Sequence, residues 1–252
     1  MTLQEMATLV SRHWKETGQG NFTPDDIFNY SPTGELSALF EWYALAKAYF
    51  DARDGMILNG RYVTLRPLGV NDAELTQAWR TSGRAFLLNR GAQTVEEQRA
   101  WIASRPFDPA RELNFLQTLT ETGQPVGMIS LVDIDLTHKR AEAAHFLIGE
   151  EEAVKGKPVA LEAVKLLYEL AFDTLGLTRL WGPVAEDNKG MIRFHLSFGY
   201  KEEARLPRHY FLNGRWQDAI FIGLTEETYR TVTKPKLEAL IRSMSRGPRS
   251  HS

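Results

Sequence analysis

The 252-residue chain contains no cysteine, which excludes disulfide bonds, thiolate zinc sites and cysteine nucleophiles. It has no excess of charge, because 30 basic residues stand against 32 acidic ones, and nothing predicts a nucleic acid or an anionic membrane as partner. No uncharged apolar run approaches the roughly 20 residues that span a bilayer, and residues 1–10 do not resemble a signal peptide. The six histidines show no metal-ligand spacing, so no metal is predicted. These absences favour a soluble cytoplasmic protein.

The most informative stretch, residues 140–168, predicts a strand, a short turn and a helix in immediate succession. The apolar run over residues 143–148 is typical of a strand, whereas from Val159 onward apolar residues recur at three- and four-residue steps, as in an amphipathic helix. The turn between them carries Lys155 and Lys157. Because a helix N-terminus presents unpaired N–H groups and the positive end of the helix dipole, this stretch predicts an anion site.

Three regions follow from the patterns along the rest of the chain. Residues 1–55 predict a small helical extension that packs on the main domain or on a second subunit. The segment around Ser37 resembles part of an acyl carrier protein, although no aspartate precedes this serine. Residues 57–230 predict an α/β or α+β domain, a mixed sheet flanked by helices, and residues 231–252 predict a helix and a disordered tail.

Within these regions the individual elements follow from periodicity, capping residues and turn residues. An Asn213-Gly214 pair predicts a two-residue hairpin turn. The predicted strands are residues 62–66, 115–120, 126–133, 143–148, 179–184, 210–212 and 216–222. The predicted helices are residues 72–81, a helix that begins at Thr94, one that begins at Val159, and residues 188–198 and 235–245.

The turn before Val159 resembles the acyl-CoA pyrophosphate loop of the GNAT N-acetyltransferase superfamily, which runs basic residue, Gly, any residue, Gly, apolar residue, Gly or Ala. Proline stands at position 158, where the second glycine is usual, and removes one N–H from the phosphate cradle. The residues that this resemblance assigns to the cofactor loop are Lys155, Gly156, Lys157, Pro158, Val159 and Ala160.

Two further segments, R-Y-V-T-L-R-P-L over residues 61–68 and G-Q-P-V-G-M-I-S-L-V-D-I-D over residues 123–135, resemble the ribosomal-protein and amino-sugar branch of that superfamily. The resemblance covers residues 57–230 and implies an enzyme with acetyl-CoA or another acyl-CoA as co-substrate. The implied acceptor is a primary amine of a small molecule, with a nucleotide-linked amino sugar favoured. A protein N-terminus as acceptor and a non-catalytic acyl-CoA-binding module are the alternatives. A second copy of the chain is a candidate partner.

Two catalytic residues follow from the resemblance. Glu142 lies 14 residues before Gly156, the spacing of the catalytic base in the histone-acetylating branch, and its alternative role is a structural ion pair with Arg140 or Lys139. His195 occupies the position of the tyrosine that protonates the leaving thiolate in the signature N-x-x-A-x-x-x-Y-x-x-x-G-F, and an imidazolium could serve the same purpose. Its alternative role is packing.

The resemblance also implies binding residues. The pantetheine arm is expected to meet Asn188, whose alternative role is a helix cap, and the thioester is expected along the splayed end of the central strand near Leu147 and Ile148. The residues assigned to the acceptor are Arg80, Arg84, Asn89 and His145. Strict alternation places His145 on the face of the strand opposite Glu142, so the two are not expected to act as a pair. For His145 the alternative is a hydrogen-bonded core histidine.

Overall fold

The computed structural model describes residues 56–85, 91–105 and 107–245. The predicted helical unit over residues 1–55, its acyl-carrier-like segment and the tail over residues 247–252 lie outside these ranges. Among the described residues, no helix has both the length and the apolar character needed to cross a membrane.

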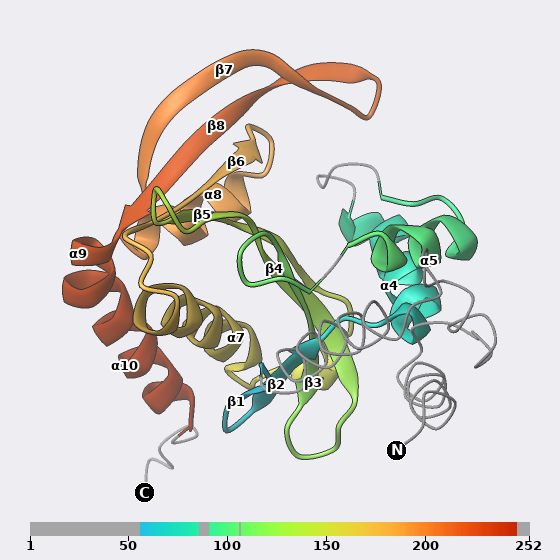
Figure 1. The fold of residues 1–252 in the computed structure, drawn as a ribbon, viewed down its shortest axis with the longest axis horizontal. Coiled ribbons are helices and arrows are strands. Elements are labelled where there is room, and N and C mark those ends of the chain that lie inside the picture. Colours follow the sequence, from blue (N-terminus) through green and yellow to red (C-terminus); the bar gives the residue numbers. More distant parts are fainter. Residues whose placement is uncertain (1–55, 86–90, 106, 246–252) are drawn as a thin grey trace, which may run out of the picture.

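The described residues form an eight-stranded mixed sheet in the order β1-β2-β3-β4-β5-β6-β8-β7, with helices on both faces (Figure 1). The fold class predicted from the sequence is therefore confirmed. The strands are β1 (Leu58–Asn59), β2 (Val63–Pro67), β3 (Leu113–Leu119), β4 (Pro125–Asp135), β5 (Arg140–Ile148), β6 (Arg179–Ala185), β7 (Lys201–Leu212) and β8 (Arg215–Thr225). The helices are α4 (Ala73–Thr81), α5 (Val95–Ala103), α6 (Glu151–Val154), α7 (Val159–Tyr168), α8 (Lys189–Ser197), α9 (Glu226–Thr228) and α10 (Lys234–Ser245). Shorter helical turns are η1 (Val70–Asp72), η2 (Gly83–Ala85), η3 (Glu169–Thr174) and η4 (Tyr229–Thr233).

Each face of the sheet carries its own apolar cluster. The larger one joins α7 and α10 to the strands, with Leu167 and Leu237 fully buried, and burial of each such leucine contributes roughly 2 kcal/mol. The smaller one joins α4 and α5 to the opposite face through Trp79, Met128 and Leu147. Strand β4 contributes Val126, Ile129, Leu131 and Ile134 to the larger cluster and Met128 to the smaller one, which explains its nearly continuous apolar sequence.

Strands β5 and β6 part soon after they begin. Their parallel pairing covers only Arg140–Glu142 against Arg179–Trp181, whereas β5 continues as far as Ile148. On its other side β5 stays paired with β4 as far as Ile148. The strand pair therefore opens like a V, and the open part of β5 is the place where the sequence predicts the thioester.

A β-bulge interrupts β5 at His145, whose φ is 54°. The register against β4 shifts between Met128 and Ser130, so β5 carries one additional residue at this point. A single inserted residue reverses the inward and outward alternation of a strand. The prediction that His145 and Glu142 face opposite sides of the sheet is therefore wrong.

The hairpin formed by β7 and β8 extends from the sheet and arches above β6 (Figure 1). Its turn residues Asn213 and Gly214 both have positive φ, as a type I′ turn requires, so the predicted hairpin is confirmed. Strand β7 begins at Lys201, much earlier than predicted, because most of its residues are exposed and polar and give no apolar alternation. Arg205 contacts Glu186 and also Asp218, which ties the arch to the loop that follows β6.

Candidate active site

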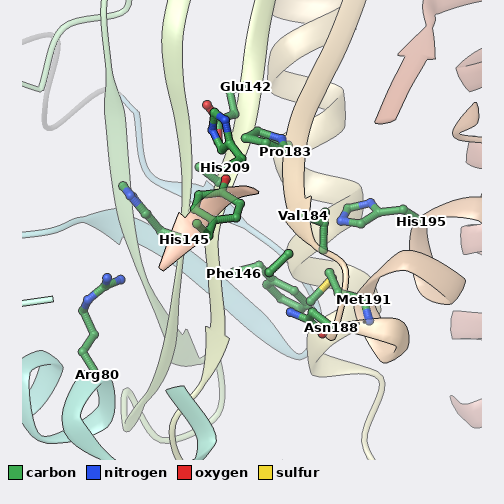
Figure 2. Close-up of a pocket in the computed structure, with 14 residues that line it drawn as sticks. Arg80, Glu142, His145, Phe146, Pro183, Val184, Asn188, Met191, His195 and His209 are labelled. Carbon is green, nitrogen blue, oxygen red and sulfur yellow. Dashed lines mark hydrogen bonds between the residues drawn. The ribbon is translucent and has the colours of Figure 1, made fainter. Parts of the chain in front are cut away.

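A cavity of about 340 Å³ lies at the point where β5 and β6 part, with α8 at one side and β7 above it. In Figure 2, Arg80 and His145 lie to the left, and His195, Met191 and Asn188 lie to the right. The residues that line it are Arg80, Glu142, Ala143, Ala144, His145, Phe146, Pro183, Val184, Ala185, Asn188, Met191, His195, His209 and Tyr210. The structure thus brings both predicted catalytic residues and two of the predicted acceptor residues to one cavity.

Glu142 stands at the last position at which β5 pairs with β6, between Val132 of β4 and Trp181 of β6. Burial raises the pKa of this carboxyl group, and the nearby charge of Asp133 raises it further, to about 7. No described residue forms an ion pair with Glu142, and the neighbouring Arg140 lies 3.6 Å from Asp135 instead. A carboxylate that is half ionised near pH 7 is suited to accept a proton.

His145 reaches the cavity from the bulge in β5. Its Nδ1 atom lies 3.1 Å from the hydroxyl of Ser130 and 3.3 Å from the amide oxygen of Asn114. Its ring meets that of Trp101 edge to face, with 5.7 Å between centroids. Burial lowers the pKa of His145 to about 4, and the positive charge of Arg80 also lowers it, so the ring is neutral at pH 7.

His195 lies on α8 and lines the opposite side of the cavity. Its ring packs edge to face on Tyr200, with 4.6 Å between centroids, and no described residue forms a hydrogen bond with its buried Nδ1 atom. Burial lowers the pKa of His195 to about 4. The charged imidazolium considered from the sequence is therefore not the form present at neutral pH, because burial disfavours the charged ring.

Tyr210 is a cavity residue that sequence reasoning missed. It lies on β7, and burial together with the charge of Glu142 raises the pKa of its phenol to about 12. Its hydroxyl therefore stays protonated and able to donate a hydrogen bond at pH 7. Nothing local in the sequence marks Tyr210, because only the arching of β7 brings it close to Glu142.

The predicted anion loop lies between α6 and α7. Gly156 adopts a φ of +73°, and a Cβ atom built there would meet no other atom within 4 Å. The N–H of Lys157 donates to the carbonyl of Val154, and Pro158 occupies the N-cap of α7. The N–H groups of the first turn of α7 precede the first intrahelical bond and have no helical acceptor.

The charged groups of the loop lie in solvent. Lys155 lies 3.3 Å from Glu152, and both side chains are largely exposed. Val159 is fully buried in the larger apolar cluster, so its side chain secures α7 and does not reach a ligand. Ala160 follows it in the first turn of the helix.

The other predicted binding residues have distinct positions. Asn188 lines the cavity, and its side-chain oxygen accepts a hydrogen bond from the N–H of Met191, which confirms the cap considered for it. The side chain of Leu147 is buried in the α4 and α5 cluster, its backbone pairs with Met128 of β4, and Ile148 pairs with Gly127. Asn89 and the side chain of Arg84 lie outside the described residues.

Arg80 is half-buried on α4 and lines the cavity. Burial lowers the pKa of its guanidinium group, which nevertheless stays charged at neutral pH. A Cβ atom added at Gly91 would collide with the Arg80 side chain, so Gly91 gives the side chain room to pass. The neighbouring Trp79 donates to Glu150 over 2.8 Å and packs on Gly149, which secures the end of α4 against the end of β5.

Comparison with known proteins adds to this geometry. Spermidine N(1)-acetyltransferase of Escherichia coli (strain K12) is 29% identical over 120 residues, which span 48% of this chain and 63% of that protein. The match thus spans less than two thirds of this relative's length. Two solved structures share the fold. A GCN5-related N-acetyltransferase from Brucella melitensis has a TM-score of 0.62 at 23% identity and covers 73% of this chain and 85% of its own. Spermidine N-acetyltransferase from Vibrio cholerae in complex with CoA and spermine has a TM-score of 0.59 at 22% identity and covers 68% of this chain and 100% of its own.

A family model described as an acetyltransferase (GNAT) domain matches residues 63–201, which begin at β2 and end at the start of β7. The match includes the cavity residues on β5, β6 and α8 and the loop around Gly156. Because it covers more than half of the 252 residues, the chain belongs to the GNAT acetyltransferase family.

Proposed function

We propose that the protein transfers an acetyl or other short acyl group from acyl-CoA to a primary amine. The observation that carries this proposal is Glu142, a carboxyl group with a pKa of about 7 in a cavity at the opening between β5 and β6. Acyl transfer to an amine needs a base, because the amine is protonated at neutral pH and attacks only as the free base. Family membership supports the same reaction.

Each step of the proposed reaction is assigned to particular residues. The backbone at Gly156 and the first turn of α7 hold the pyrophosphate, with Lys155 and Lys157 adding screened charge. Glu142 takes a proton from the ammonium group, directly or through one water molecule. The amine nitrogen then bonds to the thioester carbon, and collapse of the tetrahedral intermediate breaks the carbon–sulfur bond and releases the CoA thiolate. As a neutral ring, His195 stabilises this thiolate by donating a hydrogen bond, and a proton shed by the new amide nitrogen completes the thiol.

For the acceptor we propose an amine that also carries a negative charge, with a nucleotide-linked amino sugar as the leading case. Arg80 lines the cavity and supplies a guanidinium group, which binds phosphate or carboxylate through two parallel hydrogen bonds. The neighbouring His145 is neutral at pH 7, so it adds no opposing charge. The side chain of Arg84 and Asn89 are proposed as further contacts.

A polyamine is the second candidate acceptor, because the Escherichia coli relative is a spermidine N(1)-acetyltransferase and the Vibrio cholerae structure contains CoA and spermine. A polyamine carries additional ammonium groups that need carboxylates. Among the described residues that line the cavity, Glu142 is the carboxylate, and it is half protonated near pH 7. Arg80 adds a positive charge, so the cavity favours the anionic acceptor.

The test is release of CoA thiol from acetyl-CoA with three acceptors in parallel: a nucleotide-linked amino sugar, spermidine and a short peptide with a free N-terminus. We expect the amino sugar to support the highest kcat/KM and Arg80→Gln to reduce that value far more than the value for spermidine. Preference for spermidine, retained in Arg80→Gln, would contradict the anionic acceptor. Binding of acetyl-CoA without thiol release from any acceptor would favour a non-catalytic acyl-CoA-binding module.

A further inference from the structure

A chain of hydrogen-bonded side chains connects the protein surface to His145. The guanidinium group of Arg105 donates to Glu112 over 2.9 Å, and the amide nitrogen of Asn114 donates to the other oxygen of Glu112 over 2.8 Å. The hydroxyl of Ser130 donates to the amide oxygen of Asn114 over 2.6 Å, and Nδ1 of His145 lies 3.1 Å from that hydroxyl oxygen. The three middle members are buried, with Ser130 fully so. This series of hydrogen bonds crosses β3 and β4 and ends at His145 on β5.

The direction of these hydrogen bonds fixes the tautomer of His145. A guanidinium group only donates and a carboxylate only accepts, so the amide of Asn114 must turn its nitrogen to Glu112 and its oxygen to Ser130. Ser130 has one hydrogen, which it gives to Asn114. Both atoms that face Nδ1 of His145 are then acceptors, and Nδ1 must carry the hydrogen. Because the ring is neutral at pH 7, Nε2 is left as a bare acceptor.

The backbone holds the ring in this position. His145 has a φ of 54°, a conformation that most side chains adopt only at a cost of about 1 kcal/mol or more. The resulting bulge brings the ring to the same cavity as Glu142 and sets its edge against Trp101. Among the described residues none donates a hydrogen bond to Nε2. A neutral acceptor of fixed orientation thus lines the same cavity as the proposed base.

We propose that Nε2 of His145 accepts a hydrogen bond from a neutral O–H or N–H group of the amine acceptor, and that Ser130 and Asn114 are positioning residues that hold Nε2 free of hydrogen. This inference rests on the proposed function and narrows its acceptor to amines that carry such a group close to the reacting nitrogen, as the hydroxyl groups of an amino sugar do. Arg80 faces the same cavity, so a second ammonium group of the acceptor is disfavoured beside His145.

Two substitutions at His145 form a matched pair. In His145→Asn the amide reaches only the position of Nδ1, so it keeps the contact with Ser130, tolerates the positive φ and lacks an acceptor at Nε2. In His145→Gln the amide oxygen reaches the position of Nε2. We expect His145→Asn to raise the KM of the acceptor about tenfold, the loss of one hydrogen bond, with the KM of acetyl-CoA unchanged. His145→Gln should recover part of the loss.

The second measurement is the nitrogen-15 NMR spectrum of the histidine rings of the full chain at pH 7. The signals of His145 are those absent from the spectrum of His145→Asn, and we expect hydrogen on Nδ1 in the wild type and a mixture of tautomers in Ser130→Ala. Hydrogen on Nε2 in the wild type would overturn the proposal, as would an unchanged acceptor KM in both His145 variants. If no acceptor supports thiol release, the proposed function fails. The NMR spectrum still shows, independently of activity, which ring nitrogen of His145 carries the hydrogen.

Discussion

The low-pH side of the rate profile should report the ionisation of Glu142. Its pKa is raised to about 7, first by burial and then by the charge of Asp133, and a base works only when it is deprotonated. The value of kcat/KM should therefore increase as the pH rises through about 7. The amine acceptor also loses a proton over a higher pH range, so the wild-type profile alone mixes two ionisations.

Substitution of Asp133 by asparagine separates the ionisation of Glu142 from that of the acceptor amine. Asp133 is exposed and has a φ of 49°, which asparagine also tolerates, so Asp133→Asn removes a charge and leaves the backbone and core intact. Burial of Glu142 remains, and its pKa should settle between 4.5 and about 7. For each unit by which it falls, the rate well below the pKa increases about tenfold, whereas at pH 7 the gain stays below about twofold because half of Glu142 is already ionised.

The assay is the initial rate of thiol release at acceptor concentrations below KM, from about pH 5 to about pH 9. The ratio of the variant rate to the wild-type rate cancels the ionisation of the acceptor, and it should increase as the pH falls. Asp135→Asn is the matched control, because Asp135 lies on the same strand but contacts His138 and Arg140. A ratio that stays constant across this range would refute the assignment of Glu142 as the titrating base.

Three further predictions test the remaining parts of the site. Gly156→Val should weaken acetyl-CoA binding severely in a direct binding measurement, because valine strains a φ of +73° and fills the space proposed for the phosphate. Lys157→Ala should reduce the affinity for acetyl-CoA only slightly, and the reduction should be smaller still at high salt. Equal small losses of affinity in the two variants would contradict the phosphate loop. Glu142→Gln should lower kcat/KM by about 100-fold or more with the affinity for acetyl-CoA retained. The folded-state pKa of Glu142 lies above its ordinary 4.5, so its stabilising effect is lost as pH rises through about 7, and the same variant should have a higher Tm than the wild type at alkaline pH. His195→Phe should lower kcat with little change in acetyl-CoA affinity, and His195→Tyr should recover part of it through its hydroxyl; identical rates in the two variants would make position 195 a packing site.

Local features of the sequence were sufficient for the architecture, including the strand and the helix on either side of the proposed cofactor loop. The apolar run and the amphipathic stripe on either side of Gly156 predicted β5 and α7, and Asn213-Gly214 predicted the turn of the last hairpin. These predictions succeed because helix periodicity, strand runs and positive-φ turns depend on residues within a few positions of one another. The family resemblance of the segments that surround them likewise needs no knowledge of distant contacts.

The chemistry of the cavity was decided by the tertiary structure. Alternation along β5 placed His145 opposite Glu142, but the register against β4 inserts one residue and brings both to the same cavity. The polar sequence of β7 concealed a long strand that brings Tyr210 over the site. The pKa of a carboxyl or imidazole group depends on the loss of water around it and on charges contributed by other strands. Sequence spacing could therefore name Glu142 and His195, but only the folded chain raises the pKa of the first to about 7 and leaves the second uncharged at neutral pH.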